Sequence, residues 1–350
     1  MKHVGAIHTL LSLLMMLLAL TSCEHRPLED PYNAHYVRVY IDENIKNVTC
    51  GFYDDTRNKP EYIRPRVLRA VLANPLSGEV VSERYLQSYG EDERGYYIDG
   101  YIAAAAGEYN LMVYNFGSPK TKMRNEYSYS DMQAYTSPVS SAYYQYFPMM
   151  QEAIDNNAIR YCPDHLFLTT CESIKIESKT HVDTLFTAQG DYFTAQSAVK
   201  SYYIQVSIKG FEYIHSAISL LGGMAGTVAM STATPDEQDA VNIFFDMDYA
   251  NVELNRDAST KRAVLYATFN TFGKLAHEQS LFTMNFEFTR TDGSSQVETI
   301  DITSMFDDPI VKEHQWILIE QEIEIDPVEG AGGLSPGVET WGDEWADIQL

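Results

Sequence analysis

The stretch Tyr36-Val37-Arg38-Val39-Tyr40-Ile41 decides the fold class of this chain. Its aliphatic members Val37, Val39 and Ile41 alternate with tyrosine and arginine. Because successive side chains of a β-strand point to opposite faces, this alternation places the three aliphatic side chains on one face. The stretch therefore predicts a strand with one buried side, and with it a sheet that covers an apolar core.

The same strand pattern recurs along the rest of the chain. The turn sequences Asn74-Pro75-Leu76-Ser77-Gly78 and Asp292-Gly293 are each followed by a returning strand. Thr234-Pro235-Asp236-Glu237 predicts a short helix, since Pro suits the first helical position. Short strands separated by turns favour an all-β fold of two β-sandwich domains with short helical insertions. Further strands are predicted at residues 67–72, 96–102, 109–116, 174–176, 200–209, 263–269, 280–290, 296–302 and 316–325.

The distribution of these strands predicts two domains between flanking segments of other kinds. A chain of 350 residues suits two domains at roughly 100–200 residues each. The predicted parts are a signal peptide (1–22), a tether (23–34), a first β-sandwich (35–172), a second β-sandwich (173–326) and a C-terminal tail (327–350).

The N-terminal segment has the organisation of a secretory signal peptide. Lys2 supplies a positive start, and residues 10–20 form an apolar run that is too short for a transmembrane helix, which needs about 20 apolar residues. The ending Leu20-Thr21-Ser22-Cys23 resembles the lipobox of bacterial lipoproteins, in which the cysteine is lipidated with acyl chains such as palmitate. The alternative is an ordinary signal peptide that contains a cysteine. Lipidation of Cys23 predicts an exported protein tethered to a membrane.

The charge of the chain excludes one class of partner. The net charge is −24, and removal of Lys2 with the signal peptide makes it −25. Nucleic-acid binding needs clustered Lys and Arg that neutralise phosphates, so this acidic chain is not expected to bind nucleic acid. The charge is better explained as keeping an exposed surface protein soluble.

Cysteines outside the N-terminal segment are few. Cys162 and Cys171 are close enough in sequence to form a disulfide in an oxidising compartment, although free buried thiols remain the alternative. Cys162 and Cys171 together with His165 also resemble part of a metal site, but a clear fourth ligand is absent. The sequence therefore predicts a possible disulfide, and neither a metal site nor a cofactor.

The C-terminal tail carries apolar side chains that need burial. Residues 328–350 contain neither Lys nor Arg and begin with a Gly-rich stretch. Such a segment can pack on its own domain, remain an acidic tail, or add as a strand to the sheet edge of another molecule. The candidate donor strand is marked by Trp341, Trp345, Ile348 and Leu350.

No pattern of catalytic residues is present in the sequence. Acidic pairs such as Asp54-Asp55 and Asp307-Asp308 are typical of solvated turns, and none has a histidine at useful spacing. The Gly-rich stretch at residues 222–226 lacks the Gly-Lys-Ser/Thr ending of a phosphate-binding loop. Motifs of serine, cysteine and zinc hydrolases are absent as well. We therefore expect no enzyme activity and assign no catalytic residue.

Several motifs follow one another in fixed order and cover most of the chain after the signal peptide. They comprise the lipobox at Cys23, Ala106-Gly107-Glu108-Tyr109, Pro163-Asp164-His165-Leu166-Phe167, the stretch at residues 220–226, Phe269-Asn270-Thr271-Phe272-Gly273, and the strand at residues 316–325 with its Gly-rich tail. Together they resemble the fimbrillin-like lipoproteins (type V pilus superfamily) of anaerobic Gram-negative bacteria, which include an uncharacterised two-domain subfamily.

This resemblance implies two transthyretin-like sandwiches and a role as a stalk, anchor or tip subunit of a surface pilus (fimbria). The implied partners are other pilus subunits, or a second copy, joined by strand exchange, with the outer membrane reached through the lipid. In the superfamily an Arg-specific protease removes the first strand, and a strand from another subunit replaces it. Here the strand to be lost is the one at residues 36–41, and Arg57 or Arg64 is the candidate cleavage site.

An alternative function is a surface lipoprotein that does not polymerise and binds a host glycan or protein. Its candidate binding residues are aromatic, since aromatic faces suit contact with sugars. Packing of the same loop over the first domain is the other explanation for these residues. They are Tyr127, Tyr129, Tyr135, Tyr143, Tyr144 and Tyr146.

Overall fold

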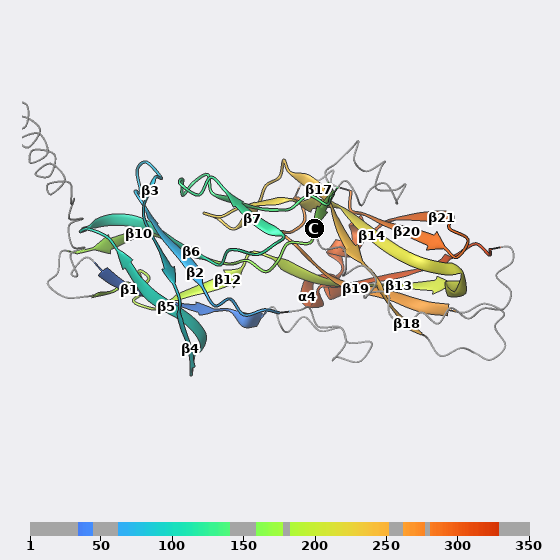
Figure 1. Cartoon of the computed structure of the whole chain (residues 1–350), viewed down its shortest axis with the longest axis horizontal. Helices are drawn as coiled ribbons and strands as arrows, with labels where there is room; N and C mark the ends of the chain where they lie inside the picture. The colour runs from blue at the N-terminus through green and yellow to red at the C-terminus, as the bar shows by residue number, and fades with distance from the viewer. Residues whose placement is uncertain are drawn as a thin grey trace, which may run out of the picture.

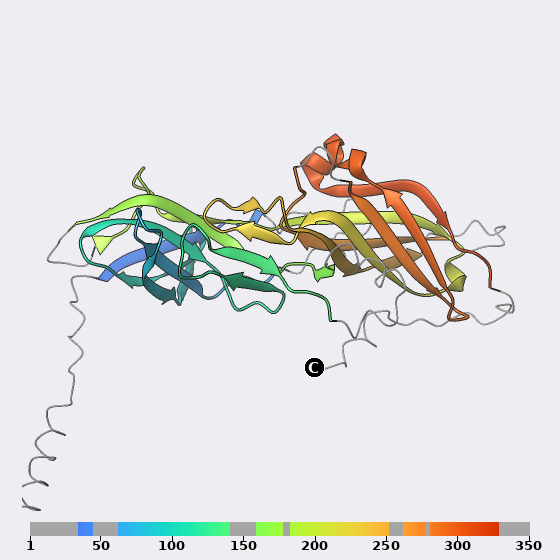
Figure 2. The same cartoon turned by 90° about the horizontal axis from the view of Figure 1, so that it is seen from above.

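The computed structural model describes residues 34–44, 62–140, 159–177, 183–251, 262–276 and 281–328 of the chain. This part of the protein consists almost entirely of β-strands. They are arranged as two lobes that follow one another along the long axis of the molecule (Figures 1 and 2). The first lobe contains the blue and green strands, and the second contains the yellow, orange and red ones (Figure 1).

One continuous sheet forms the first lobe. Its strands are β1 (Ala34–Ile41), β2 (Leu68–Ala73), β3 (Val80–Leu86), β4 (Ser88–Asp92), β5 (Gly95–Ala103), β6 (Gly107–Tyr114), β10 (Phe167–Ile176), β11 (Asp183–Thr184) and β12 (Phe193–Ser197). Within the described residues they follow the order β3-β2-β6-β10-β12-β1-β5-β4, and β11 pairs with the start of β1.

This sheet folds around a single apolar core. Val39 of β1, Leu72 of β2 and Ile98 of β5 are buried in the same cluster. Because strands from distant parts of the sheet cover one core, the sheet is closed on itself as a sandwich. The turn from one layer to the other occurs where β3 ends at Leu86 and β4 begins at Ser88. Together β3 and β4 form a nearly continuous strand, of which the β3 part pairs with β2 and the β4 part pairs with β5.

The second lobe is a sandwich of two separate sheets. Its strands are β9 (Ile159–Tyr161), β13 (Lys200–Lys209), β14 (Ile214–Ala225), β17 (Ala240–Asp246), β18 (Asp248–Asn251), β19 (Arg262–Thr271), β20 (Thr283–Arg290), β21 (Ser295–Asp301) and β22 (Trp316–Glu324). One sheet has the order β18-β19-β13-β22, and the other has the order β21-β20-β14-β17-β9. Side chains from both sheets share one core, in which the Phe245 and Phe269 rings stack at 4.4 Å.

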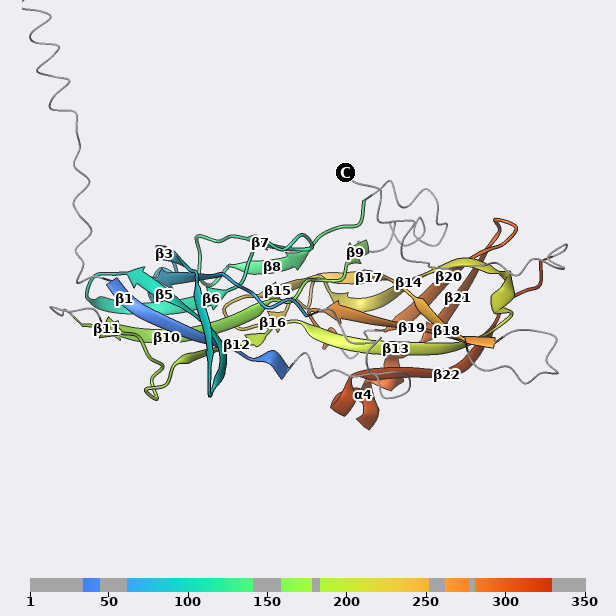
Figure 3. The same ribbon diagram turned by 60° about the horizontal axis from the view of Figure 1, so that its bottom comes forward.

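The two lobes share a small sheet and a core at their junction (Figure 3). This sheet contains β7 (Thr121–Arg124), β8 (Gln133–Thr136), β15 (Thr227–Ala229) and β16 (Thr234–Pro235) in the order β16-β15-β8-β7. Strand β8 pairs with β15, which follows directly on β14 of the second lobe. A third apolar cluster beneath it combines Met112 and Tyr114 of β6 with Val228 of β15 and Phe272. The junction is therefore packed as an interior and not as a hinge.

The all-β fold predicted from the sequence is confirmed, including the sandwich packing. The alternating stretch at residues 36–41 forms β1, and the stretch at residues 316–325 forms β22. The helical insertions are short: η3 (Phe211–Tyr213), η4 (Thr303–Asp307) and α4 (Pro309–His314). The N-terminus of α4 is capped by the Asp308 carboxylate, which accepts a hydrogen bond of 2.8 Å from the Ile310 amide, with Pro309 in the first helical position.

The helix predicted at Thr234-Pro235 is wrong. Those two residues form β16, in which Pro235 pairs with Val228 and Thr234 with Ala229. Antiparallel pairing with the nearby strand β15 therefore overrides the local helix signal. The predicted domain limits remain a prediction. The pairing of β12 with β1 and β10 extends the first sheet as far as Ser197, which lies beyond the expected boundary at residues 172/173.

Candidate functional site

Strand β1 lies in the interior of the first sheet. It pairs antiparallel with β5 from Ala34 to Tyr40, and it pairs parallel with β12 from Val39 to Ile41. Val37 and Val39 are fully buried in the core of the lobe. Removal of β1 would therefore open a groove between β5 and β12, with unpaired backbone groups on both sides and an exposed apolar floor.

The outer face of β1 is held to its neighbours by polar and aromatic contacts. The Tyr36 hydroxyl donates a hydrogen bond to the Asp99 carboxylate of β5, and burial together with this bond raises the pKa of Tyr36 to about 12. The Arg38 guanidinium lies 3.9 Å from the centre of the Tyr97 ring and forms ion pairs of 3.4 Å with Asp92 and Asp99. Such a cation–π contact adds about 0.5–2 kcal/mol.

A second tyrosine of β1 reaches β4. The Tyr40 hydroxyl donates a hydrogen bond of 2.8 Å to the Asp92 carboxylate, and this bond lowers the pKa of Asp92. The Tyr40 ring also packs edge-on against Tyr97 at 5.7 Å. Strand β1 is therefore fixed by its backbone ladder, by its buried face and by its outer face.

The candidate cleavage residues lie after β1. Arg57 falls outside the described residues. Arg64 is described, and its guanidinium forms ion pairs with Glu43 at 2.6 Å and with Glu91 at 3.4 Å. These contacts tie the returning chain to the end of β1 and to β4. Arg66, which the sequence interpretation did not single out, has an exposed side chain.

The two cysteines of the predicted disulfide are both free thiols in this structure. Cys171 packs against the core of the first lobe, whereas Cys162 packs against the core of the second. The Cys162 thiol lies 3.4 Å from the Phe244 carbonyl, and burial raises its pKa to about 11. Sequence proximity suggested a bridge, but the chain places the two side chains in different cores.

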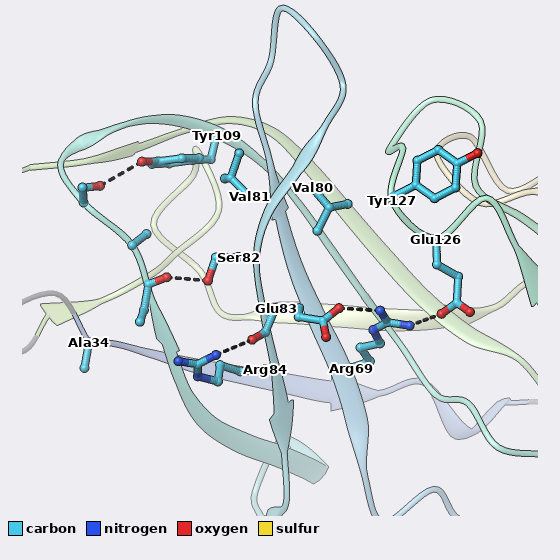
Figure 4. A pocket seen from close by; sticks show the side chains of 13 residues that line it. Ala34, Arg69, Val80, Val81, Ser82, Glu83, Arg84, Tyr109, Glu126 and Tyr127 are labelled. Carbon is cyan, nitrogen blue, oxygen red and sulfur yellow. Dashed lines mark hydrogen bonds and ion pairs between the residues drawn. The ribbon is translucent and has the colours of Figure 1, made fainter. Parts of the chain in front are cut away.

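A cleft of about 1020 Å³ with a mixed polar and apolar lining opens beside β3 (Figure 4). One wall is the edge of β3 from Val80 to Arg84, and the other is formed by the end of β5 and the residues after it, 103–105. The two walls approach closely at the narrow end, where a Cβ added to Gly100 would lie 3.2 Å from the Leu86 Cα. The cleft is therefore a gap between two strands that touch at one end and diverge toward the other.

The charges that line this cleft balance. The Arg69 guanidinium forms ion pairs with the carboxylates of Glu83 and Glu126, and Arg84 supplies the second positive charge (Figure 4). Tyr127 stands at the rim with 73% of its surface exposed. The site therefore offers hydrogen-bonding groups and aromatic surface without a net charge.

A second cavity of about 1040 Å³ lies at the lobe junction. Its lining includes the basic residues Arg64, Arg66 and Lys120 and the acidic residue Asp246. Burial raises the pKa of Asp246, and the positive charge of Lys120 opposes that rise. Among the residues that the structure describes, no group of three or more His, Cys, Asp or Glu is placed to hold a metal ion.

Several predicted functional residues fall outside the described part of the chain. They include Cys23, Arg57 and the tail residues Trp341, Trp345, Ile348 and Leu350. Of the tyrosines proposed to bind sugar, Tyr129 is 5% exposed within the junction core and only Tyr127 is largely exposed, while Tyr143, Tyr144 and Tyr146 lie outside the described residues. Within the described residues, no helix is long and apolar enough to span a bilayer.

Comparison with protein families gives a match to a domain of unknown function, DUF5119, over residues 87–246. These residues run from the end of β3 through the lobe junction to the end of β17. A Bacteroides ovatus protein that carries the provisional name fimbrium anchoring subunit Fim4B is 23% identical over 357 aligned positions, which cover 95% of each chain.

Comparison with solved structures gives proteins of similar fold. A crystal structure of a B. ovatus protein, provisionally called an adhesin, has a TM-score of 0.58 at 19% identity and covers 88% of this chain and 98% of its own. The two proteins therefore share a fold. The fimbrial anchor protein Mfa2 of Porphyromonas gingivalis has a TM-score of 0.43 at 10% identity, over 77% of this chain and 83% of its own. The chain is thus similar in sequence to a protein named as a fimbrium anchoring subunit, and it shares its fold with a protein called an adhesin.

Proposed function

We propose that this fimbrillin-like chain is an accessory subunit of a surface fimbrium, of the anchoring kind, that keeps its first strand. The alignment with the anchoring subunit of B. ovatus over 95% of both chains supports the proposal. The observation that carries it is the position of β1, which pairs with β5 on one side and with β12 on the other. On the outer face of β1, Arg38 also forms ion pairs with Asp92 and Asp99. A strand held in this way resists the exchange that a polymerising subunit needs.

The energetics favour retention of β1. Release would expose the buried side chains of Val37, Val39 and Ile41, each of which gains about 1.5–3 kcal/mol from burial. It would also break two backbone ladders and the contacts of Arg38. A stalk subunit recovers this loss when a donor strand arrives. An anchor that ends the fibre on the cell has no need of the exchange in its first lobe.

We infer that lipidated Cys23 attaches the anchor to the outer membrane. The chain from Cys23 to the start of β1 at Ala34 spans at most about 40 Å when fully extended. The tether therefore keeps the first lobe close to the bilayer, with the second lobe farther along the long axis. Acyl chains supply about 0.8 kcal/mol of binding per buried CH₂ group, which suits a fixed attachment.

We place the connection to the next fimbrial subunit in the C-terminal tail. Trp341, Trp345, Ile348 and Leu350 supply bulky apolar side chains, and an extended segment of this kind can add to a sheet of another subunit. In this arrangement the anchor donates a strand without accepting one in place of β1. The same apolar residues would otherwise face water at a considerable cost.

Treatment with an Arg-specific protease tests the proposal. The purified chain from Glu24 to Leu350, without lipid, is incubated with the protease and followed by mass spectrometry and size-exclusion chromatography. We expect that β1 stays bound to the first lobe even when a bond between residues 57 and 66 is cut, and that the protein remains monomeric. Loss of residues 34–41 together with assembly into SDS-resistant ladders would instead identify a polymerising stalk subunit.

A second candidate function is binding of a glycan or protein by a lipoprotein that does not join a fimbrium. Exposed aromatic surface favours it: Tyr127 lies at the rim of the β3 cleft, and the Tyr85 and Phe116 rings stack at 5.1 Å with 50% and 39% exposure. The two functions differ in one expectation, since only the anchor retains fibres on the cell. Cys23→Ala should release intact fimbriae into the medium if the chain is an anchor, and should leave them attached if it is not.

A further inference from the structure

We propose that the cleft between β3 and the end of β5 is a preformed acceptor for an extended strand of another polypeptide, open while β1 stays in place. This acceptor is separate from the groove that β1 fills, and it needs no proteolysis. It also does not depend on the anchor role, because the argument rests on the backbone edges of the cleft alone.

Both walls of the cleft are strand edges without a partner strand among the described residues. Strand β3 ends the sheet order and pairs only with β2. Strand β5 pairs with β1 along its length, but β4 covers its other edge only from Gly95 to Asp99, so the edge from Gly100 to Ala103 has no ladder. At the wide end, the Val80 amide already bonds the Tyr127 carbonyl at 2.9 Å. Residues 127–128 thus begin to pair beside the start of β3, and among the described residues no strand continues this pairing along residues 82–84.

Side chains occupy the backbone acceptors that a strand would use (Figure 4). The Ser82 hydroxyl donates to the Ala103 carbonyl at 2.5 Å, and the Tyr109 hydroxyl donates to the Ala105 carbonyl at 3.2 Å. The Arg84 guanidinium donates to the Glu83 carbonyl at 3.0 Å. Backbone groups need hydrogen-bond partners, and these three side chains act as exchangeable substitutes. An incoming strand would replace them with ladder bonds.

The lining of the cleft determines the chemistry of the strand that fits. Part of its lining consists of small side chains, Ala34 and the alanines at 103–105, which leave room for bulky apolar residues at alternate positions of the guest. The charges of Arg69, Arg84, Glu83 and Glu126 cancel, so an anionic ligand gains nothing from the site. Open N–H and C=O groups match another peptide backbone better than they match a sugar.

The position of the cleft indicates where such a partner acts. Ala34 is both a lining residue and the first residue of β1, so the cleft lies at the end of the first lobe where the preceding chain leaves it (Figures 1 and 4). A strand bound here would join the lobe to a neighbour at the pole that carries the tether. Val81, with 52% exposure, adds apolar surface at the same wall.

Peptide selection against the purified chain from Glu24 to Leu350 tests the proposal. A library of random peptides about 10 residues long, the length of a strand, is panned on the protein and the enriched peptides are measured by calorimetry. Two cleft variants, Ala105→Trp and Val81→Arg, fill or charge the cleft at exposed positions. Tyr89→Trp is the matched control, since Tyr89 is 55% exposed on β4 and does not line the cleft.

We expect enriched peptides with alternating bulky apolar residues that bind one to one. Their affinity should fall by about tenfold or more in both cleft variants and stay unchanged in the control, which corresponds to at least about 1.4 kcal/mol. Methylation of a peptide amide should weaken binding at every position whose N–H group pairs with β3 or with the end of β5, so amides on both edges of the guest strand are expected to matter. The proposal is overturned by failure to enrich any peptide, by equal binding to the cleft variants, or by tolerance of methylation at every position.

Discussion

The Ser82 hydroxyl of β3 donates a 2.5 Å hydrogen bond to the Ala103 carbonyl at the end of β5. This side-chain bond joins two strand edges that no ladder joins, at the point where the walls of the cleft begin to separate. The first lobe is therefore a sandwich with one open seam. The predictions below follow from this open edge, from the contacts of Arg38 on the outer face of β1 and from the packing at the lobe junction.

Ser82→Ala should destabilise the first lobe slightly while making the cleft easier to enter. Loss of one hydrogen bond costs about 0.5–1.5 kcal/mol, which urea denaturation can resolve. Ser207→Ala is the control, because Ser207 is exposed on β13 in the other lobe. The prediction fails if both variants unfold at the same urea concentration as the parent chain.

Arg38→Met should loosen β1 without disturbing its buried face. The variant removes the cation–π contact with Tyr97 and both ion pairs while it keeps a long aliphatic side chain. We expect faster hydrogen exchange at the β1 amides, and loss of β1 after cleavage by an Arg-specific protease. Unchanged hydrogen exchange across residues 34–41 would mean that the contacts of Arg38 do not help to hold β1 in the sheet.

Ile98→Ala should lower the free energy of unfolding by about 2–5 kcal/mol. The Ile98 side chain is fully buried opposite Val39, so its truncation leaves a cavity that the sheet cannot close. Tyr101→Ala on the same strand is the control, since Tyr101 is 56% exposed. A difference of less than about 1 kcal/mol between the two variants would contradict the assigned core.

Stability should fall at alkaline pH, above pH 10. Burial raises the pKa of Tyr114 and of Tyr129 to about 12, against an ordinary value of 10. Because these tyrosines hold their protons more tightly in the folded than in the unfolded protein, they add to the free energy of unfolding. This contribution is complete below pH 10 and is lost as the pH rises from 10 to 12. Phenolate absorbance should show late-titrating tyrosines whose number falls by one in Tyr114→Phe, and an unchanged count would refute the assignment.

The two cysteines should react as free thiols at different rates. Both side chains are half-buried, and burial raises the pKa of both thiols, but it raises that of Cys162 to about 11, so very little Cys162 thiolate is present at neutral pH. Iodoacetamide should modify Cys171 first in the native protein, and both cysteines after unfolding without a reductant. A pair that stays unmodified after unfolding would establish the disulfide that the sequence suggested.

Local alternation was enough to predict the strands that cover the cores. Val37, Val39 and Ile41 form the buried face of β1, and Ile317, Ile319 and Ile323 do the same in β22. In both strands the alternation of apolar residues predicts the strand and its buried face, and only the neighbouring strands with which it pairs depend on the rest of the fold.

Features made by distant segments were beyond sequence reasoning. The pairing of Thr227 with Tyr135 joins the lobes across a long separation in sequence. The β3 cleft exists because two strands diverge, which no local pattern records. Arg64 stays a candidate cleavage site, and its ion pairs with Glu43 and Glu91 join residues that no local pattern connects.

The N-terminal sequence of the native chain tests the central claim most directly. The protein is isolated from the outer membrane and from purified fimbriae of the bacterium that makes it, and its first residue and attached groups are determined by mass spectrometry. Our account predicts a chain that begins with acylated Cys23 and still contains residues 34–41. A mature chain that begins after Arg57, Arg64 or Arg66 and has lost β1 would contradict it.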